Sequence, residues 1–327
     1  MSLVACLIPM LYDIYFHNDF DGRACAAVML SFLRSRGDDI ERYVAMTYGK
    51  ESAWYDEKFF EKSGKNPAIV MDFTYHPKAA WWFDHHPSTF KKIEWKSRFI
   101  PDKQHHLESQ YPSCCGLVYA ALQKDFDWKA PRHFAQFVKS ADLIDGAGYR
   151  SAKQTILMKT PDLLMNAFIE GLPHSEKEDK LIIELMSTQS LAKVIQHPTI
   201  RKALVQLNKK VKASLAFHKK NVEMWNDDDV TFINLAGDPL NGLLRYAPYY
   251  LYPKISFSIR MRPKGKLWYL GVAVNPWRKP SLDIDLGALI REYHGGGHKG
   301  IGATEFHSKK EAMKAKKEII ERLKQPQ

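Results

Sequence analysis

The chain places two carboxylates and an imidazole directly after a short apolar segment. In the stretch IYFHNDFDGRA, residues 14–24, three apolar residues precede His17, Asp19 and Asp21. Residues at alternate positions of an extended segment point the same way, so we expect these three side chains to converge. Neighbouring carboxylates repel unless a cation or a shared proton compensates. The stretch predicts a charged site, with a solvated loop as the alternative.

The same pattern occurs twice more within the first 86 residues. The apolar run AIVM is followed by Asp72, and AWWF is followed by Asp84, His85 and His86. A single aspartate at a strand end is usually a turn residue. In open α/β sheets, however, ligands bind at the carboxyl ends of the strands. Three strands that each end in acid or imidazole groups therefore indicate one shared site.

The donor types indicate which cation such a site would bind. Carboxylates and imidazoles without thiolates suit Mn²⁺, Fe²⁺ or Zn²⁺, and Mg²⁺ is less natural because of the histidines. The carboxylates are too many for one divalent ion. They fit a pair of ions about 3.5–4 Å apart, which in phosphoester hydrolysis activates a hydroxide and neutralises the departing oxygen. The four cysteines show no CxxC spacing, which argues against a cysteine zinc site and for a reducing, cytoplasmic location.

The charge balance is basic. The chain has 48 Lys and Arg against 37 Asp and Glu, a net charge of +11. Such an excess favours an anionic partner, phosphate-rich or nucleic-acid-like, although an ordinary basic surface is the alternative. The charge does not choose between a polymer and a small phosphorylated molecule. No apolar run has the length of a membrane span, and the apolar segment 3–12 lacks the basic region of a signal peptide.

The elements that must position these groups follow an α/β pattern. Up to about residue 145, short apolar strands, including SRFI at 97–100, alternate with helices, one of them opened by Ser113 as N-cap. This alternation predicts a mainly parallel sheet. The segment from about 161 to 226 is helical and ends in a long basic helix, and strand-like runs follow it. We place a first domain at 1–205, a connecting helix at 206–226 and a second domain at 227–327.

Four motifs in order give the chain a recognisable resemblance. DFDG, the aspartate that ends the AIVM strand, DHH at 84–86 and GGGH at 295–298 resemble the DHH/DHHA1 phosphoesterase superfamily. That superfamily includes RecJ-like single-strand exonucleases, nanoRNase oligoribonucleases and cyclic-dinucleotide phosphodiesterases. The motifs span residues 17 to 305. The resemblance implies an α/β fold with an N-terminal, mainly parallel-sheet DHH domain, a linker helix and a smaller C-terminal α/β DHHA1 domain.

The resemblance also implies roles for the residues of the first domain. One set of side chains would hold two divalent ions: His17, Asp19, Asp21, Asp72, His85 and Asp142. Asp72 would bridge the ions, and Asp145 is the alternative to Asp142. His86 would face the scissile phosphate as a catalytic residue together with Asp72, while Asp84 would orient a histidine or the loop. Mn²⁺ is the favoured ion, with Mg²⁺ or another divalent ion as alternatives.

In the second domain the resemblance implies that the substrate contacts the glycine motif and an arginine. The motif residues are Gly295, Gly296, Gly297 and His298, and Arg260 would grip a phosphate. Arg262 is the alternative, because both arginines lie on the same face of one strand.

Together these features predict a metal-dependent phosphodiesterase, a hydrolase that degrades short oligonucleotides from an end as an exonuclease or oligoribonuclease. The short spacing from His17 to Asp19 is closer to the RecJ form of the first motif, which leaves the substrate open. The alternatives are a phosphomonoesterase of the pAp type, a cyclic-dinucleotide or polyphosphate hydrolase, or a non-catalytic nucleic-acid-binding module. The expected partner is a short oligonucleotide or nucleotide phosphate and not a membrane. The oligomeric state is open, with a homodimer as one option.

Overall fold

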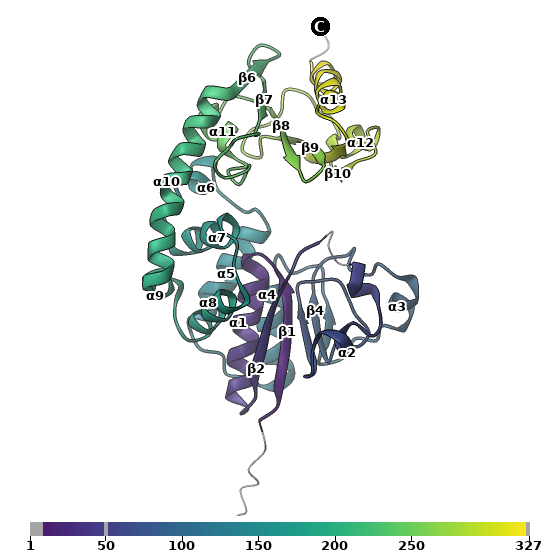
Figure 1. The fold of residues 1–327 in the computed structure, drawn as a ribbon, viewed down its shortest axis with the longest axis vertical. Coiled ribbons are helices and arrows are strands. Elements are labelled where there is room, and N and C mark those ends of the chain that lie inside the picture. The colour runs from purple at the N-terminus through teal and green to yellow at the C-terminus, as the bar shows by residue number, and fades with distance from the viewer. Residues whose placement is uncertain (1–8, 49–51, 325–327) are drawn as a thin grey trace, which may run out of the picture. The chain divides into compact units, whose positions relative to one another are not determined.

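The computed structural model describes residues 9–48 and 52–324 and divides into two compact units (Figure 1). The first unit ends at Gly148 and resumes with Lys159–Ala203, and the second contains Tyr149–Met158 and the chain from Leu204 onward. The first eight residues, and with them part of the apolar segment 3–12, lie outside the described residues. None of the helices in the described part of the chain is long and apolar enough to cross a membrane.

The first unit is built on a five-stranded parallel sheet in the order β2-β1-β3-β4-β5. Its strands are β1 Leu11–His17, β2 Asp39–Met46, β3 Ala68–Met71, β4 Trp81–Asp84 and β5 His105–Leu107. The order of the strands changes direction at β1 and β3, and ligands bind outside the carboxyl ends at such a switch point. The α/β prediction is confirmed, and the topology selects the ends of β1 and β3 as the place for a site.

Helical segments cover both faces of this sheet (Figure 1). The helical segments of the first unit are η1 Ser52–Tyr55, α1 Phe20–Ser35, α2 Phe59–Ser63, α3 Ile93–Arg98, α4 Cys114–Phe126, α5 Phe134–Asp145, α7 Pro161–Gly171, α8 Glu176–Thr188 and α9 Leu191–Val194, of which α7 and α9 pack on other helices. On one face, side chains of β1, β3 and β4 pack in an aromatic cluster with Trp54 and Trp95. The opposite face carries α1 and α4, and α1 is buried along most of its length. A sheet covered on both sides explains why its short strands read as continuous apolar runs.

One predicted strand is wrong. The SRFI segment is not a strand, because Trp95 is buried in the aromatic cluster and the chain around it forms α3. The fifth strand is instead β5, in which His105 pairs with Trp82 and His106 stacks on Phe83 with ring centroids 5.1 Å apart. The sequence does not predict β5, because two consecutive histidines do not resemble a strand pattern. In the structure, the His106 ring stacks on an apolar side chain and the His105 ring is hydrogen-bonded.

The second unit contains a mixed sheet in the order β10-β11-β9-β8-β7-β6. Its strands are β6 Val222–Trp225, β7 Val230–Asn234, β8 Phe257–Lys264, β9 Leu267–Val274, β10 Gly296–His298 and β11 Ile301–Phe306. Its helices are α6 Ala152–Leu157, α11 Ala247–Leu251, α12 Leu286–Arg291 and α13 Lys309–Arg322. One face of the sheet forms an apolar core with α12 and α13. This arrangement agrees with the predicted smaller C-terminal α/β domain.

The change from one unit to the other occurs within the long helix α10 Pro198–Asn221. The predicted connecting helix began at 206 and ran to 226, whereas α10 begins earlier and the chain after it turns into β6. Segment 149–158 lies with the second unit, in which Trp277 Nε1 donates a hydrogen bond to the Tyr149 carbonyl at 2.7 Å. This return of an early segment has no signal in composition or periodicity.

Candidate metal centre

The first motif is a sharp transition from strand to helix. His17 is the last residue of β1, Asp19 caps α1 by accepting a hydrogen bond from Gly22 N at 2.9 Å, and Asp21 lies in the first helical turn. The prediction of an extended segment with three side chains on one face is therefore wrong. A Cβ on Gly22 would lie 2.1 Å from the His17 carbonyl oxygen, so only glycine permits this close turn. The turn still brings all three side chains to the sheet edge.

Asp72 lies directly after β3 and is buried, with 1% of its surface exposed. Its φ of 54° is left-handed, a conformation that is uncommon outside glycine and enriched at functional sites. Neither of its carboxylate oxygens has a hydrogen-bond partner in the described part of the chain. A buried carboxylate without donors is strongly disfavoured, which indicates that a cation is its normal partner.

The two oxygens of Asp72 face two different groups. Asp72 Oδ2 lies 3.5 Å from His17 Nδ1, and Asp72 Oδ1 lies 3.7 Å from His85 Nε2. Ligand atoms of His17, Asp19 and Asp72 lie within 4.8 Å of one another, as do those of a second group, Asp21, His85 and Asp145. Asp72 thus stands between two clusters of metal-ligand type.

The contact between His17 and Asp19 has the geometry of shared coordination. His17 Nδ1 lies 2.7 Å from Asp19 Oδ2, yet His17 Nδ1 makes no hydrogen bond in the described structure. Two donors bound about 2.1 Å from one ion at about 90° lie about 3 Å from each other. The close approach of His17 to Asp19 without a hydrogen bond is therefore consistent with both side chains binding the same ion.

In the second group, neighbouring elements hold each ligand from behind. Asp21 accepts hydrogen bonds from the backbone N–H of Cys114 at 2.7 Å and of Cys115 at 3.0 Å, at the start of α4. His85 Nδ1 lies 3.0 Å from the Tyr111 carbonyl, so Nδ1 carries the proton. In the neutral ring, His85 Nε2 presents its lone pair, 3.2 Å from Asp145 Oδ2. Histidines that bind metals are usually oriented in this way.

The structure brings Asp145, and not Asp142, to this group. Asp142 Oδ1 accepts a hydrogen bond from the Ser113 hydroxyl at 2.6 Å, beside the cap of α4. Both aspartates lie on α5, and three residues turn the side chains of an α-helix by less than a full turn. Sequence motif matching could not resolve that rotation. We therefore replace Asp142 with Asp145 in the candidate ligand set.

His86 is oriented by Asp84. His86 Nδ1 donates to Asp84 Oδ1 at 2.8 Å, and the same oxygen accepts the backbone N–H of His85 at 2.8 Å and of His86 at 3.1 Å. Asp84 is fully buried and so fixes the loop that carries both histidines. The predicted orienting role of Asp84 agrees with this geometry.

The electrostatics of the cluster reflect uncompensated negative charge. Burial, and then the charges of Asp145 and Asp19, raise the pKa of Asp21 to about 8. Burial and the neighbouring carboxylates raise the pKa of Asp72 well above its usual range. Burial opposes the charged form of His85, but Asp145, the Tyr111 carbonyl and the charge of Asp21 together outweigh this effect and raise the pKa of His85 to about 9. The residues present fit two divalent ions of the Mn²⁺ type, which would replace these protons.

We expect Mn²⁺ affinity to rise steeply with pH. Metal ligands must be deprotonated, and Asp21 with a pKa of about 8 and His85 with a pKa of about 9 hold protons at pH 6. Each proton released gives up to about a tenfold gain in affinity per pH unit below that pKa, so tighter binding accompanies rising pH. Calorimetric titration with Mn²⁺ at pH 6, 7 and 8, in buffers of different ionisation enthalpy, measures affinity and proton release. Affinity that is independent of pH would contradict the assignment.

In the second unit, Arg260 lies on β8, and its predicted anion-binding role stays a prediction. The residue is half-buried, and burial lowers the pKa of its guanidinium. Among the described residues it has no ion pair. A row of paired residues crosses the sheet from Arg260 to the glycine motif. Arg260 pairs with Gly271 of β9, Gly271 pairs with Ala303 of β11, and Ala303 pairs with Gly296 of β10. Paired residues point to the same face, so Arg260 and the glycine motif share a face along a row of small residues. Arg262 lies over the Tyr269 ring at 5.1 Å.

Most of the glycine motif is a strand. Gly296–His298 form β10, an exposed edge strand paired with β11. Gly297 has a φ of 152°, and a Cβ on it would lie 2.1 Å from the Ile301 carbonyl oxygen. The glycines therefore allow close strand pairing and leave the N–H and C=O groups of an edge strand available.

Sequence patterns did not indicate Tyr48, which follows β2. Its ring stacks on Phe73 with ring centroids 4.8 Å apart and also contacts the His17 ring, again with centroids 4.8 Å apart. Burial and the nearby carboxylates, Asp84 first, raise its pKa, so its hydroxyl keeps its proton. The only available signal was its place at a strand end next to the β1 site.

No protein-family model matches the sequence, and a search of curated proteins finds no match. Solved structures do resemble it. A pGpG-specific phosphodiesterase from Vibrio cholerae matches with a TM-score of 0.67 and 18% identity over 95% of this chain and 98% of that chain. RecJ from Thermus thermophilus, in complex with Mn²⁺, matches with a TM-score of 0.57 and 12% identity over 96% of this chain and 52% of RecJ. The DHH domain of a member of a ribosomal protein family matches with a TM-score of 0.51 and 15% identity, over 97% and 88% of the two chains.

The chain has the DHH/DHHA1 fold. The matches extend over nearly its whole length, through both units. Three of the motifs that suggested the resemblance lie at the ends of β1, β3 and β4, and the fourth, GGGH, contains β10 of the second unit. At these identities the likeness concerns the fold. In this fold the candidate metal centre lies at the β1/β3 switch point of the parallel sheet.

Proposed function

We propose that this protein is a metal-dependent phosphodiesterase that hydrolyses short oligonucleotides or related nucleotide phosphoesters. The observation that carries the proposal is Asp72, whose two buried, unpartnered oxygens each face a separate histidine-containing group. Two divalent ions held by the two groups would activate water and neutralise charge on the departing oxygen.

The chain's own residues would position the reacting groups. His17, Asp19 and Asp72 form one ligand group, and Asp21, Asp72, His85 and Asp145 form the other. Asp84 accepts the Nδ1 hydrogen of His86, which leaves His86 Nε2 for the substrate phosphate. In the second unit, the guanidinium of Arg260 and the exposed strand β10 would bind a phosphate and the substrate end.

The choice of a short oligonucleotide rests on the charge and on the neighbours. A net charge of +11 favours a polyanion. The structural neighbours that match over nearly the full length of both chains include a phosphodiesterase named as specific for pGpG. We propose Mn²⁺ as the ion, because imidazole and carboxylate ligands occur together here and the Thermus RecJ structure contains it.

A substrate panel tests the proposal. Purified protein with Mn²⁺ is incubated with labelled RNA and DNA of 2 to 24 nucleotides, pAp, cyclic dinucleotides and polyphosphate. We expect cleavage of the short linear oligonucleotides, with products shortened by one nucleotide at a time. Release of inorganic phosphate from pAp or polyphosphate alone would favour a phosphomonoesterase or polyphosphatase instead. Cleavage of none of these compounds would reject the function.

A further inference from the structure

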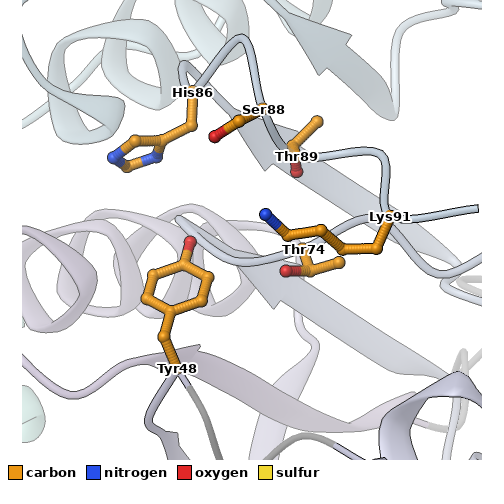
Figure 2. A pocket seen from close by; sticks show the side chains of 6 residues that line it. All are labelled: Tyr48, Thr74, His86, Ser88, Thr89 and Lys91. Atoms are coloured by element: carbon orange, nitrogen blue, oxygen red, sulfur yellow. The ribbon is translucent and has the colours of Figure 1, made fainter. Parts of the chain in front are cut away.

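A polar pocket lies beside the candidate metal centre, within the first unit (Figure 2). Its volume is ≈290 Å³, and it is lined by Tyr48, Thr74, His86, Ser88, Thr89 and Lys91. Figure 2 shows the Tyr48 hydroxyl, the Lys91 ammonium and the His86 ring around a common space. Four of the six residues carry hydroxyls, one carries an ammonium, and none carries a carboxylate. Such a lining suits an anion with several oxygens.

Thr74 shows that the pocket wall has an unused polar group. The residue is fully buried, and its Oγ1 has no hydrogen-bond partner in the described structure. Leaving a buried hydroxyl unsatisfied is unfavourable, so such groups usually have a ligand or water partner. Thr89, on the opposite side of the pocket in Figure 2, accepts the Tyr75 backbone N–H at 3.3 Å and keeps its own hydroxyl proton for a ligand.

Lys91 differs from the lysine next to it. Lys92 donates to the Tyr55 carbonyl at 2.6 Å and lies over the Trp95 ring at 4.6 Å. Lys91 has no ion pair among the residues that the structure describes, and Figure 2 shows its ammonium directed into the pocket. An ammonium without an ion pair, beside the unpartnered hydroxyl of Thr74, attracts an anion.

The position of Tyr48 argues against a nucleobase in this pocket. Its ring stacks on Phe73 with an interplanar angle of 27°, and it also contacts the His17 ring. Base recognition relies on an open aromatic face, whereas Tyr48 presents its hydroxyl edge to the pocket. The hydroxyl is a hydrogen-bond donor, as a phosphate oxygen requires.

We propose that this pocket binds a second phosphate of the substrate, next to the one that is cleaved. The inference rests on the proposed function for the identity of the cleaved phosphate. His86 belongs both to the pocket lining and to a group of possible metal ligands with Asp72 and His85, so the two phosphates would lie on either side of one imidazole. The second phosphate is the 5′-phosphate of a short oligonucleotide or the next phosphate of a polyphosphate chain.

Hydrolysis kinetics test the pocket. The full-length, Mn²⁺-loaded protein is assayed with a ribodinucleotide that carries a 5′-phosphate, the same dinucleotide with a 5′-hydroxyl, and tripolyphosphate. We expect kcat/KM to favour the 5′-phosphate by about tenfold, the effect of one charge-assisted hydrogen bond. Lys91→Ala should bring this ratio close to one, and Thr74→Val should lower it several-fold. A wild-type ratio near one, together with no effect of Lys91→Ala on tripolyphosphate, would overturn the proposal.

The matched control is Lys96→Ala, which removes the same charge from an exposed position of α3 outside the pocket lining. It should keep the wild-type ratio. If Lys91→Ala lowers kcat/KM for tripolyphosphate and leaves the dinucleotide ratio unchanged, the second phosphate belongs to a polyphosphate chain. A purely structural role of Thr74 would change the melting temperature of Thr74→Val without changing the ratio, and would remove Thr74 from the proposal.

Calorimetric binding to metal-free protein separates the pocket from catalysis. We expect the 5′-phosphorylated dinucleotide to bind about tenfold more tightly than the 5′-hydroxyl form, and Lys91→Ala to abolish the difference. Equal affinities, or no binding of either compound, would refute the pocket. Preferential binding without any hydrolysis in Mn²⁺ would refute the proposed function and leave the pocket supported.

Discussion

Replacing Asp72 with asparagine is expected to lower the rate of Mn²⁺-dependent hydrolysis by more than about a hundredfold. Mutating a residue that only orients a metal ligand already lowers metal affinity or activity by about 10–100-fold. The same substitution should stabilise the metal-free protein. Asp72 is 1% exposed, its two oxygens have no described donor, and burial followed by neighbouring carboxylates raises its pKa. A neutral amide avoids the cost of burying this carboxylate charge or of protonating it. We expect a higher melting temperature without metal, by about 2–4 °C for each kcal/mol gained.

Thermal unfolding with and without Mn²⁺ measures both effects. Mn²⁺ should raise the melting temperature of the wild type strongly and that of Asp72→Asn little, since a ligand stabilises only the form that binds it. Asp145→Asn should behave like Asp72→Asn. The control is Asp142→Asn, in which the amide oxygen can still accept the Ser113 hydroxyl, so activity should stay within about twofold of wild type. Equal Mn²⁺ stabilisation of Asp72→Asn and wild type would contradict the bridging role.

Replacing Arg23 with methionine is expected to destabilise the first unit by about 3–5 kcal/mol. Arg23 is fully buried on α1 and contacts Asp179 of α8 through Nε at 2.9 Å and Nη2 at 2.7 Å. It also donates to Asn18 Oδ1 at 2.7 Å and to the Asp19 carbonyl at 3.1 Å. Removing it leaves the Asp179 charge buried without a partner and frees the turn that carries Asp19.

Urea unfolding measures this loss of stability. Arg34→Ala on the same helix is the control, because Arg34 is 39% exposed and its ion pairs with Asp39 and Glu184 lie at the surface. Exposed pairs contribute at most about 1 kcal/mol. The double variant Arg23→Met, Asp179→Leu should recover much of the stability, because it removes both charges. It should not recover Mn²⁺ affinity, since the turn at Asn18 and Asp19 would still lack its anchor. A loss in Arg23→Met no larger than that in Arg34→Ala would show that the buried pair is unimportant.

The sequence alone determined which chemistry the first unit can carry. His17, Asp72 and His85 follow apolar runs long enough to be strands, and parallel strands bring their carboxyl ends to one edge. This reasoning needs only local patterns. It gave the α/β class, the sheet edge and nearly all candidate ligands, and Ser113 as the N-cap of α4 agrees with the structure.

Local sequence patterns gave wrong predictions where the secondary structure depends on contacts with residues distant in the sequence. The turn after His17 is helical, because Gly22 lets α1 begin against the end of β1, and period-two spacing could not reveal this. The SRFI segment failed as a strand because Trp95 is needed in the aromatic cluster, a tertiary demand that overrides local propensity.

Only the tertiary structure decided between the two aspartates of α5 and revealed the pocket. The motif favoured Asp142 and left Asp145 as the alternative. In the structure, α5 packs against α4, and Asp142 lies toward Ser113 while Asp145 lies toward His85. The pocket joins Tyr48, Thr74 and Lys91, which come from three separate loops of the chain. Sequence spacing encodes the direction of a side chain within one element. The meeting of side chains from different elements is set by packing, which only the folded chain contains.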